Sequence, residues 1–341
     1  MKKPNLDAIE LQIKSNIRSR HKFKGKPNSQ KESYTNYSMP DCFDLSNKQY
    51  RQESLRAINA IHTHKNSKAR PYFDFAKVKV LMPMATIYFK QLLEKYDDVK
   101  CRGRAPTHPV VSGMLSKLNI SQRLGFKTLK STHSLVERWY FFSGENTDLG
   151  DEYDEIENVL IEKFGEESET FDVINTAIGE AVINVVNHAY KPDDTYKKWY
   201  LFLSITSDKC SVVISDLGQT IPNTIPLKIS DNVLARVFNV SSWASLKDDA
   251  KIEIATQYQK TATKLPNRGK GFQDMQAVCD EVTGSTMMVH SRLGYWAKKN
   301  GTTVRYKKQN YKSYVNGTII SWVLPLDNSS IVVDSTVPSE N

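Results

Sequence analysis

The sequence has 341 residues, 39% of them hydrophobic, with 47 Lys and Arg against 38 Asp and Glu. This length and composition exclude a chain that is disordered throughout, and they suit roughly two globular domains. No apolar run approaches the roughly 20 residues of a membrane-spanning helix, and the first residues lead into charged side chains instead of the apolar core of a signal peptide. We therefore expect a cytoplasmic protein without a membrane span.

The excess of basic residues is confined to an N-terminal arm. Residues 1–70 carry 15 Lys and Arg and 6 Asp and Glu, whereas residues 71–341 carry 32 of each sign. Apolar residues at helical spacing predict one short helix over residues 6–17 and another around residues 55–61. We interpret residues 1–70 as a basic appendage to the folded part of the chain.

Residues 71–140 alternate between strand and helix patterns and predict a small α/β domain. The expected elements are a strand at 72–80, a helix at 85–96, a strand at 99–102 and a helix at 110–118. Residues 141–170 then contain 11 acidic residues and one basic residue. We expect this segment to be a solvated linker or an exposed helix face.

Residues 171–326 predict a helix-rich layer on a mixed sheet, and a polar tail follows at 327–341. A long helix is expected at 171–190, and residues 220–267 are expected to be irregular. The expected strands are 199–206, 211–215, 286–291, 302–306 and 317–324. The predicted fold class is therefore α/β (α+β), with two successive domains.

The four cysteines do not form a recognisable metal or disulfide pattern. Cys42, Cys101, Cys210 and Cys279 lie far apart and include no C-x-x-C pair. A zinc knuckle and a disulfide framework are therefore not encoded, and we expect reduced thiols that mostly fill space.

The predicted helix at 171–190 carries the most informative pattern. Glu180, Asn184, Asn187 and His188 share one helix face, opposite the apolar residues that can cover a sheet. A carboxylate one turn from an amide oxygen suits metal-assisted attack of water on a phosphate, with Asn184 holding Mg²⁺ and Glu180 orienting or deprotonating the water. Taken alone, such a spacing more often marks a wet helix face, and His188 is better explained as a polar-face residue than as a phosphoacceptor or metal ligand.

Two glycine-containing turns follow this helix in the chain. An apolar strand runs into Asp216-Leu217-Gly218, where a carboxylate can accept a hydrogen bond from a base amine and a glycine permits close approach of the backbone. Gly269-Lys270-Gly271 precedes a predicted helix and offers N–H donors and a cation to a phosphate. Either turn alone would be an ordinary loop.

The three elements in this order resemble the nucleotide-binding boxes of the GHKL (Bergerat-fold) ATPases, the superfamily of gyrase, Hsp90, sensor histidine kinases and MutL. Gly317-Thr318, before a strand that ends at Leu324-Pro325, resembles a further box. The first box is similar to that of anti-sigma-factor serine kinases. The resemblance covers residues 171–326 and implies a two-layer α/β sandwich of the Bergerat type.

The resemblance also implies a role for each matching residue. Asn184 would coordinate Mg²⁺, Glu180 would be the catalytic base, and Asp216 would bind the adenine amino group with Thr318 in support. Gly218 would lie beside the base, and Gly269, Lys270 and Gly271 would contact the phosphates. Residues 220–267 would form a lid over ATP.

Two positions depart from the family pattern. Thr220 stands where a second glycine is usual, which puts close backbone approach there in doubt, and Lys270-Gly271-Phe272 replaces the commoner apolar-Gly-Leu.

Residues 71–140 resemble, more weakly, the STAS-like fold of anti-sigma-factor antagonists, on the segment from Phe73 to Val80 and the helix that follows it. The start of that helix, Met82-Pro83-Met84-Ala85, has no serine to accept a phosphate. The resemblance then implies a domain that keeps a docking shape without a phosphoacceptor. An unrelated α/β layer is the alternative.

Three functions remain open from the sequence. The first is an Mg²⁺-dependent ATPase, or a kinase that phosphorylates Ser or Thr of a partner protein, working as a regulatory switch and able to form a homodimer. The second is a non-catalytic ATP sensor or scaffold for protein interactions. The third is a nucleic-acid-associated ATPase whose arm contacts phosphates through a set of basic residues: Arg18, Arg20, Lys22, Lys24 and Lys26.

Overall fold

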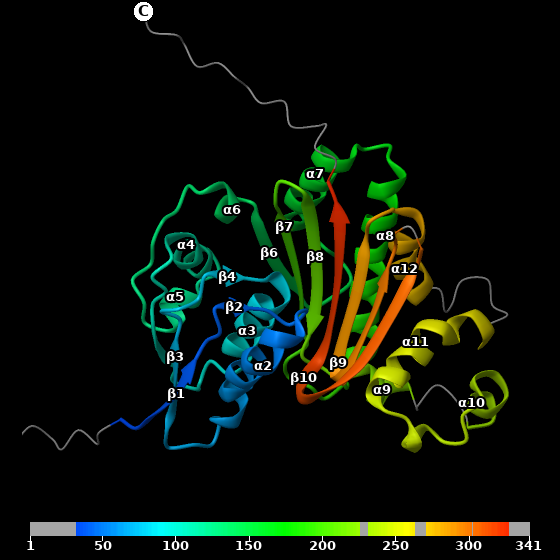
Figure 1. Cartoon of the computed structure of the whole chain (residues 1–341), viewed down its shortest axis with the longest axis horizontal. Helices are drawn as coiled ribbons and strands as arrows, with labels where there is room; N and C mark the ends of the chain where they lie inside the picture. Colours follow the sequence, from blue (N-terminus) through cyan, green and yellow to red (C-terminus); the bar gives the residue numbers. More distant parts are fainter. Residues whose placement is uncertain (1–31, 226–230, 263–270, 302, 327–341) are drawn as a thin grey trace, which may run out of the picture.

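A computed structural model of the chain describes residues 32–225, 231–262, 271–301 and 303–326 (Figure 1). The predicted basic residues Arg18 to Lys26, the tail at 327–341, and Gly269 and Lys270 of the predicted phosphate loop lie outside the described residues. Among the helices that the structure describes, none is long and apolar enough to cross a membrane. The described chain forms two α/β units, which we call the N-terminal unit (residues 32–137) and the sheet unit (residues 139–326).

The N-terminal unit is built on a three-stranded parallel sheet. Its strands, in the order β1-β3-β5, are β1 (Tyr34–Ser38), β3 (Arg70–Asp74) and β5 (Arg102–Arg104). Two short strands, β2 (Cys42–Phe43) and β4 (Val80–Leu81), pair beside it. The predicted limit at residue 70 therefore falls within one sheet, because β1 comes from the expected appendage and pairs along its whole length with β3.

Helices α2 (Lys48–Thr63) and α3 (Pro83–Lys95) are the long helices of the N-terminal unit. The side chain of Asn47 caps α2 by accepting from the Gln49 N–H, and Pro83 opens α3, where its missing N–H removes no helical bond. Residues 84–93 of α3 are buried without interruption. A helix that is buried all round lies between two layers, which is where α3 is found. The short helices are α4 (Pro109–Lys117), α5 (Ile120–Arg123) and α6 (Ser134–Glu137).

The sheet unit contains five strands in the order β6-β7-β8-β10-β9, and every neighbouring pair is antiparallel. The strands are β6 (Trp139–Gly144), β7 (Trp199–Ile205), β8 (Lys209–Asp216), β9 (Thr286–Lys299) and β10 (Arg305–Pro325). The predicted strand at 317–324 and the last two residues of the one at 302–306 thus belong to one long strand, whose register shifts twice between Asn310 and Thr318.

Helices cover both faces of this sheet, and Figure 1 shows α2 and α3 on one side and α8 and α12 on the other. Alternate residues of one strand separate the two cores: Phe202 packs with the N-terminal unit, whereas Leu201 and Leu203 pack with α8 and α12. Trp322 Nε1 donates to the Met275 carbonyl of α12 at 2.9 Å. The α+β class is confirmed, and the N-terminal unit adds a third layer to the expected two-layer sandwich.

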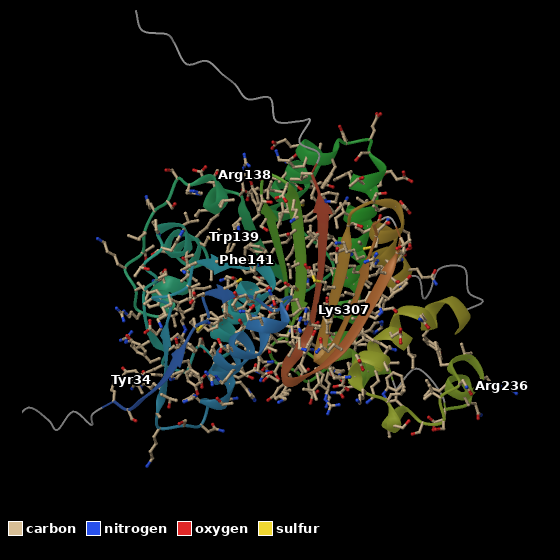
Figure 2. All side chains as sticks on the ribbon, viewed as in Figure 1. Tyr34, Arg138, Trp139, Phe141, Arg236 and Lys307 are labelled. Carbon is tan, nitrogen blue, oxygen red and sulfur yellow. The ribbon has the colours of Figure 1, made fainter. Side chains whose placement is uncertain are left out.

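The aromatic run at the start of β6 shows the same alternation. Trp139 packs edge to face on Phe202, and Lys90 Nζ of α3 lies 4.5 Å from the centre of the Phe141 ring. Phe142 instead contacts Tyr153 on the opposite side of the strand. Figure 2 shows Trp139 and Phe141 between the two units. These rings therefore pack between layers of the fold.

The acidic segment 141–170 contains the end of β6 and helix α7 (Glu152–Phe164). Its Ile156 and Leu160 are buried in the core of the sheet unit, while its acidic residues Asp154 and Glu155 are exposed. The segment is therefore a helix with one solvated face, and not a free linker. The expected division of the chain into five segments stays a prediction.

The remaining helices belong to the sheet unit. They are α8 (Glu169–Asn184) with the π-helical turn η1 (Val185–Ala189), α9 (Ile221–Thr224), α10 (Asp231–Phe238), the 3₁₀ turn η3 (Trp243–Ser245), α11 (Asp248–Ala262) and α12 (Gly271–Glu281). The expectation of an irregular segment at 220–267 was therefore wrong for its described residues. Helix α11 buries Ile252 and Ala255 against the sheet unit, and this tertiary packing supports a helix with little amphipathic pattern of its own.

Candidate nucleotide site

Helix α8 positions the predicted catalytic pair. Ser168 caps the helix by accepting from the Phe171 N–H at 3.1 Å, and Ile174, Ile178 and Val182 bury its apolar face. Glu180 and Asn184 lie half-buried on another face, one turn apart. The predicted helix at 171–190 is therefore present as far as Ala189, and its last turn, η1, is a π-helix, a form that is frequent at functional sites.

The amide nitrogen of the Asn184 side chain already makes a hydrogen bond. Its Nδ2 donates to the Glu180 backbone carbonyl at 2.8 Å. The amide oxygen points the other way, as a neutral hard ligand one turn from a carboxylate. Mg²⁺ typically takes few protein oxygens and completes its shell with water and substrate phosphates, so this donor set fits a magnesium ion that arrives with a nucleotide. Within the described ranges, no group of three His, Cys, Asp or Glu side chains is arranged to hold a metal.

Gly271, the first residue of α12, lies directly against this pair. A Cβ atom added at Gly271 would stand 2.9 Å from Asn184 Nδ2 and 2.9 Å from Glu180 Oε2. Any side chain at this position would therefore push into the space that the carboxylate and amide occupy. Of the predicted phosphate loop, this is the only residue in the described part of the chain, and it lies where the loop prediction requires, at the start of a helix beside Glu180.

Two effects raise the pKa of the Glu180 carboxyl. Burial raises the pKa of its carboxyl, and the negative charge of Asp274 on α12 raises that pKa further. A carboxylate with a raised pKa binds a proton more strongly and is therefore a better acceptor of a proton from water.

Asp216 lies at the end of β8 and is buried. Its Oδ1 accepts from the Gly218 N–H at 2.8 Å. Burial raises the pKa of Asp216 to about 7, while hydrogen bonds from the backbone N–H groups of Gly218 and Thr318 act in the opposite direction. The residue is directly paired with Thr318 of β10 across the sheet. The sequence therefore brings together two predicted adenine ligands that lie about a hundred positions apart.

Two glycines, Gly218 and Gly317, allow other backbone segments to approach the Asp216 turn closely. A Cβ atom at Gly218 would lie 2.1 Å from the Ala189 carbonyl oxygen, at the end of η1. Gly317 has a φ of +84°, and a Cβ there would lie 2.2 Å from the Asp216 carbonyl oxygen. The backbones of η1, the Asp216 turn and β10 are thus in close contact. Because η1 continues α8, one helical segment connects this contact to Glu180 and Asn184.

Sequence reasoning missed three residues that stabilise the Asp216 turn and the segments next to it through hydrogen bonds. Tyr190 OH accepts from the Leu217 N–H at 3.0 Å and donates to the Lys198 carbonyl at 2.6 Å. Lys95 Nζ of α3 donates to the Leu217 carbonyl at 3.0 Å. Ser291 Oγ accepts from the Ile221 N–H at 3.0 Å and is hydrogen-bonded to Thr318 Oγ1 at 3.0 Å. Tyr190 had a signal, since it ends the predicted helix at 171–190, whereas Lys95 and Ser291 depend on contacts between distant segments.

The predicted site residues thus form two groups along α8 and η1. Glu180, Asn184 and Gly271 meet at one group, and Asp216, Gly218 and Thr318 meet at the other. His188 is exposed on η1. Gly269 and Lys270 lie outside the described residues, so their placement relative to either group stays a prediction.

The comparison with protein families agrees with this geometry. The model of the histidine kinase-like ATPase domain matches residues 145–286. The match begins just after β6, ends at the first residue of β9, and includes every residue of the two groups except Thr318. The search among curated proteins found no match. The resemblance to GHKL ATPases is therefore confirmed for this segment, while the anti-sigma-factor kinase type and the STAS-like fold stay predictions.

Proposed function

We propose that the chain binds ATP with Mg²⁺ along α8, between the Asp216 turn and the start of α12. One observation carries the proposal: Gly271 of α12 lies against both Glu180 and Asn184 of α8, and η1, which follows Asn184, ends against the Asp216 turn at Ala189. The family match at residues 145–286 supports it. A ligand that reaches both groups of residues would place a base at the Asp216 turn and phosphates near Glu180 and Asn184.

The adenine end of the site would be Asp216 and Thr318. The Asp216 carboxylate accepts from the backbone N–H groups of Gly218 and Thr318, and its remaining lone pairs would accept from the exocyclic amine of adenine. Thr318 Oγ1, oriented by Ser291, would support the same base from the neighbouring strand. Gly218 would lie beside the base.

The phosphate end would be Asn184, Glu180 and the loop before α12. Bound Mg²⁺ would neutralise phosphate charge during the reaction. Asn184 would hold it through Oδ1, and the N–H groups at Gly271 together with Gly269 and Lys270 would receive the phosphates. Glu180 would take a proton from water, or from a hydroxyl group of a partner protein.

The reaction class that we favour is ATP hydrolysis, or phosphoryl transfer to Ser or Thr of a partner, in a regulatory protein of the cytoplasm. The raised pKa of Glu180 favours chemistry over binding alone. Radiolabelled ATP incubated with the chain and cell lysate separates the two reactions, since hydrolysis releases phosphate and transfer labels a protein.

A non-catalytic ATP sensor or scaffold is the second candidate, and Thr220 favours it. This residue is 7% exposed and stands where a glycine would let the backbone approach the nucleotide. A sensor would bind ATP with neither phosphate release nor a labelled partner. Two further hypotheses are a nucleic-acid function of residues 1–70 and a homodimer. The first is tested by measuring DNA binding after removal of residues 1–70. The second is tested by sedimentation.

The direct test of the proposed site is calorimetric titration with ATP, with and without Mg²⁺. Glu180→Ala should keep nucleotide binding and lose turnover, by about 100-fold or more, because it removes the base and leaves the adenine ligands. Retained turnover in Glu180→Ala would contradict the assignment of the base.

A further inference from the structure

Helix α3 of the N-terminal unit holds the end of β8 on both sides of Asp216. Gln91 Nε2 donates to the Ser215 carbonyl at 3.1 Å, and Ser215 Oγ donates to Gln91 Oε1 at 2.8 Å. One turn further along α3, Lys95 Nζ donates to the Leu217 carbonyl at 3.0 Å. Ser215 and Leu217 are the residues immediately before and after Asp216 in the chain. The predicted adenine ligand therefore lies between two backbone groups that α3 fixes.

The same helix also holds β10 close to Thr318. Tyr88 OH accepts from the Asn316 N–H at 2.8 Å, two positions before Thr318. The pairing of β10 with β8 ends at Thr318 and Asp216, so hydrogen bonds between these two strands no longer fix the backbone beyond that pair. The side chains of α3 supply hydrogen bonds at this place. Both strands that carry the predicted adenine ligands are therefore held by one helix.

The position of α3 is set by the core of the N-terminal unit. The three side chains that bind the strands share one face of the helix, because positions 88, 91 and 95 follow the helical repeat. Phe89, on another face, packs edge to face on Phe73 of β3, with 5.0 Å between the ring centroids. Tyr88 and Gln91 are fully buried, so a backbone group that lost either partner would stay unpaired. A shift of α3 within the N-terminal unit would therefore shift both strands.

Lys95 also acts on Asp216 through its charge. Burial raises the pKa of Asp216 to about 7, and backbone hydrogen bonds and the positive charge of Lys95 oppose this rise. The ionised carboxylate only accepts hydrogen bonds, which is what recognition of an adenine amine requires. Lys95 therefore favours the form of Asp216 that would bind adenine.

We infer that Tyr88, Gln91 and Lys95 are positioning residues of the nucleotide site, which hold Asp216 and Thr318 where adenine binds. The inference rests on the proposed ATP site, because it assigns these residues to the adenine end of that site. Affinity for ATP then depends on the position of α3. By linkage, bound ATP stabilises the contact between α3 and the sheet unit.

The experiment compares Tyr88→Phe and Lys95→Met with the unchanged chain. Each variant removes one polar group of α3 and keeps a side chain of similar size. ATP affinity, measured by calorimetry with Mg²⁺, should fall by about threefold to thirtyfold in each variant. Turnover at saturating ATP should be retained while KM rises, because Glu180 and Asn184 at the phosphate end are not changed. Partial unfolding would instead lower kcat and the number of ATP sites per chain.

Ser116→Ala is the matched control in the N-terminal unit. The Ser116 hydroxyl group is buried, is hydrogen-bonded to Ser121 Oγ and accepts from the Leu129 N–H, at 3.0 Å in each case. None of these residues belongs to α3. This variant should lower the unfolding temperature and keep ATP affinity. Unchanged ATP affinity in both Tyr88→Phe and Lys95→Met would overturn the inference, and so would an equal loss in Ser116→Ala.

Asp216→Asn, measured in parallel, separates this inference from the proposed ATP site. If Asp216→Asn loses ATP affinity while both α3 variants keep it, the ATP site stands and the role of α3 is wrong. If Asp216→Asn keeps the affinity of the unchanged chain, the proposed ATP site is itself wrong, and the inference fails with it.

Discussion

The ammonium group of Lys95 and the carbonyl oxygen of Leu217 are 3.0 Å apart, although 122 positions separate the two residues. The Leu217 N–H is held at the same time by Tyr190 at the end of the α8 segment. The backbone of Leu217, the residue after Asp216, is thus held by side chains from both sides of the sheet. The N-terminal unit is therefore in direct contact with the turn that we propose to bind adenine.

Substitution of Gly271 tests the phosphate end of the site. Gly271→Ala should reduce ATP turnover by about tenfold or more, because its Cβ would displace Glu180 or Asn184 from their present positions. The chain should stay folded, since the clash is with two side chains. Turnover with saturating ATP is the measurement.

Gly179→Ala is the matched control for this variant. A Cβ at Gly179, on the same helix α8, meets nothing within 4 Å. It should keep full turnover and raise the free energy of unfolding by about 0.5–1 kcal/mol, as alanine does in a helix. Equal turnover of the two variants would contradict the placement of Gly271 at the reacting end.

The contact between the two units can be measured through Gln91 and Ser215. Gln91 Nε2 donates to the Ser215 carbonyl at 3.1 Å, and Ser215 Oγ donates back to Gln91 Oε1. Ser215→Ala and Gln91→Leu should each lower the free energy of unfolding by about 1–3 kcal/mol, because each leaves a buried polar group unpaired. The double variant should lose less than the sum. Strict additivity in urea unfolding would show that the contact is absent in solution.

The free energy of unfolding should depend on pH because of Asp216. Its folded pKa of about 7 lies above the usual value of 3.8, so between about pH 4 and pH 7 the folded state binds the extra proton. Stability from this group is therefore present at low pH and is lost as pH rises to 7, by up to about 4 kcal/mol. Asp216→Asn has no titrating group and should lack this loss.

The comparison is the free energy of unfolding at pH 5 and at pH 8, for the unchanged chain and for Asp216→Asn without nucleotide. Other groups cancel in the difference between the two proteins. A difference that is the same at both pH values would contradict the buried, proton-binding state of Asp216.

The rate of ATP turnover should rise with pH through the raised pKa of Glu180, because only the ionised carboxylate accepts a proton. Asp274→Asn removes the negative charge that helps to raise this pKa, and it should move the rise to lower pH. An unchanged pH profile in Asp274→Asn would show that the two carboxyl groups are not coupled.

The sequence predicted those parts of the site that depend on local spacing. Glu180 and Asn184 lie one turn apart on a helix because of their positions alone, and the Asp216 turn follows an apolar strand. Ser291 and Lys95 could not be predicted in this way, because their partners are set by strand register and by packing between units. The same reason explains β1, which pairs with β3 only after the chain folds.

The placement of functional groups was less predictable than the elements themselves. Thr220 was identified as a departure from a glycine pattern, but the burial of its side chain depends on tertiary packing and could not be predicted. The helices α10 and α11 were missed, since their stability comes from contacts such as that of Ile252 with the sheet unit.

The central claim is that ATP lies between the Asp216 turn and Glu180, and the most direct measurement is the affinity for ATP of Asp216→Asn. In Asp216→Asn an N–H₂ group replaces one acceptor oxygen, so a donor would face either the adenine amine or a backbone N–H that now binds the carboxylate. We predict an affinity about tenfold or more below that of the unchanged chain, with the affinity of Glu180→Ala retained. Equal ATP affinity of Asp216→Asn and the unchanged chain would contradict the account.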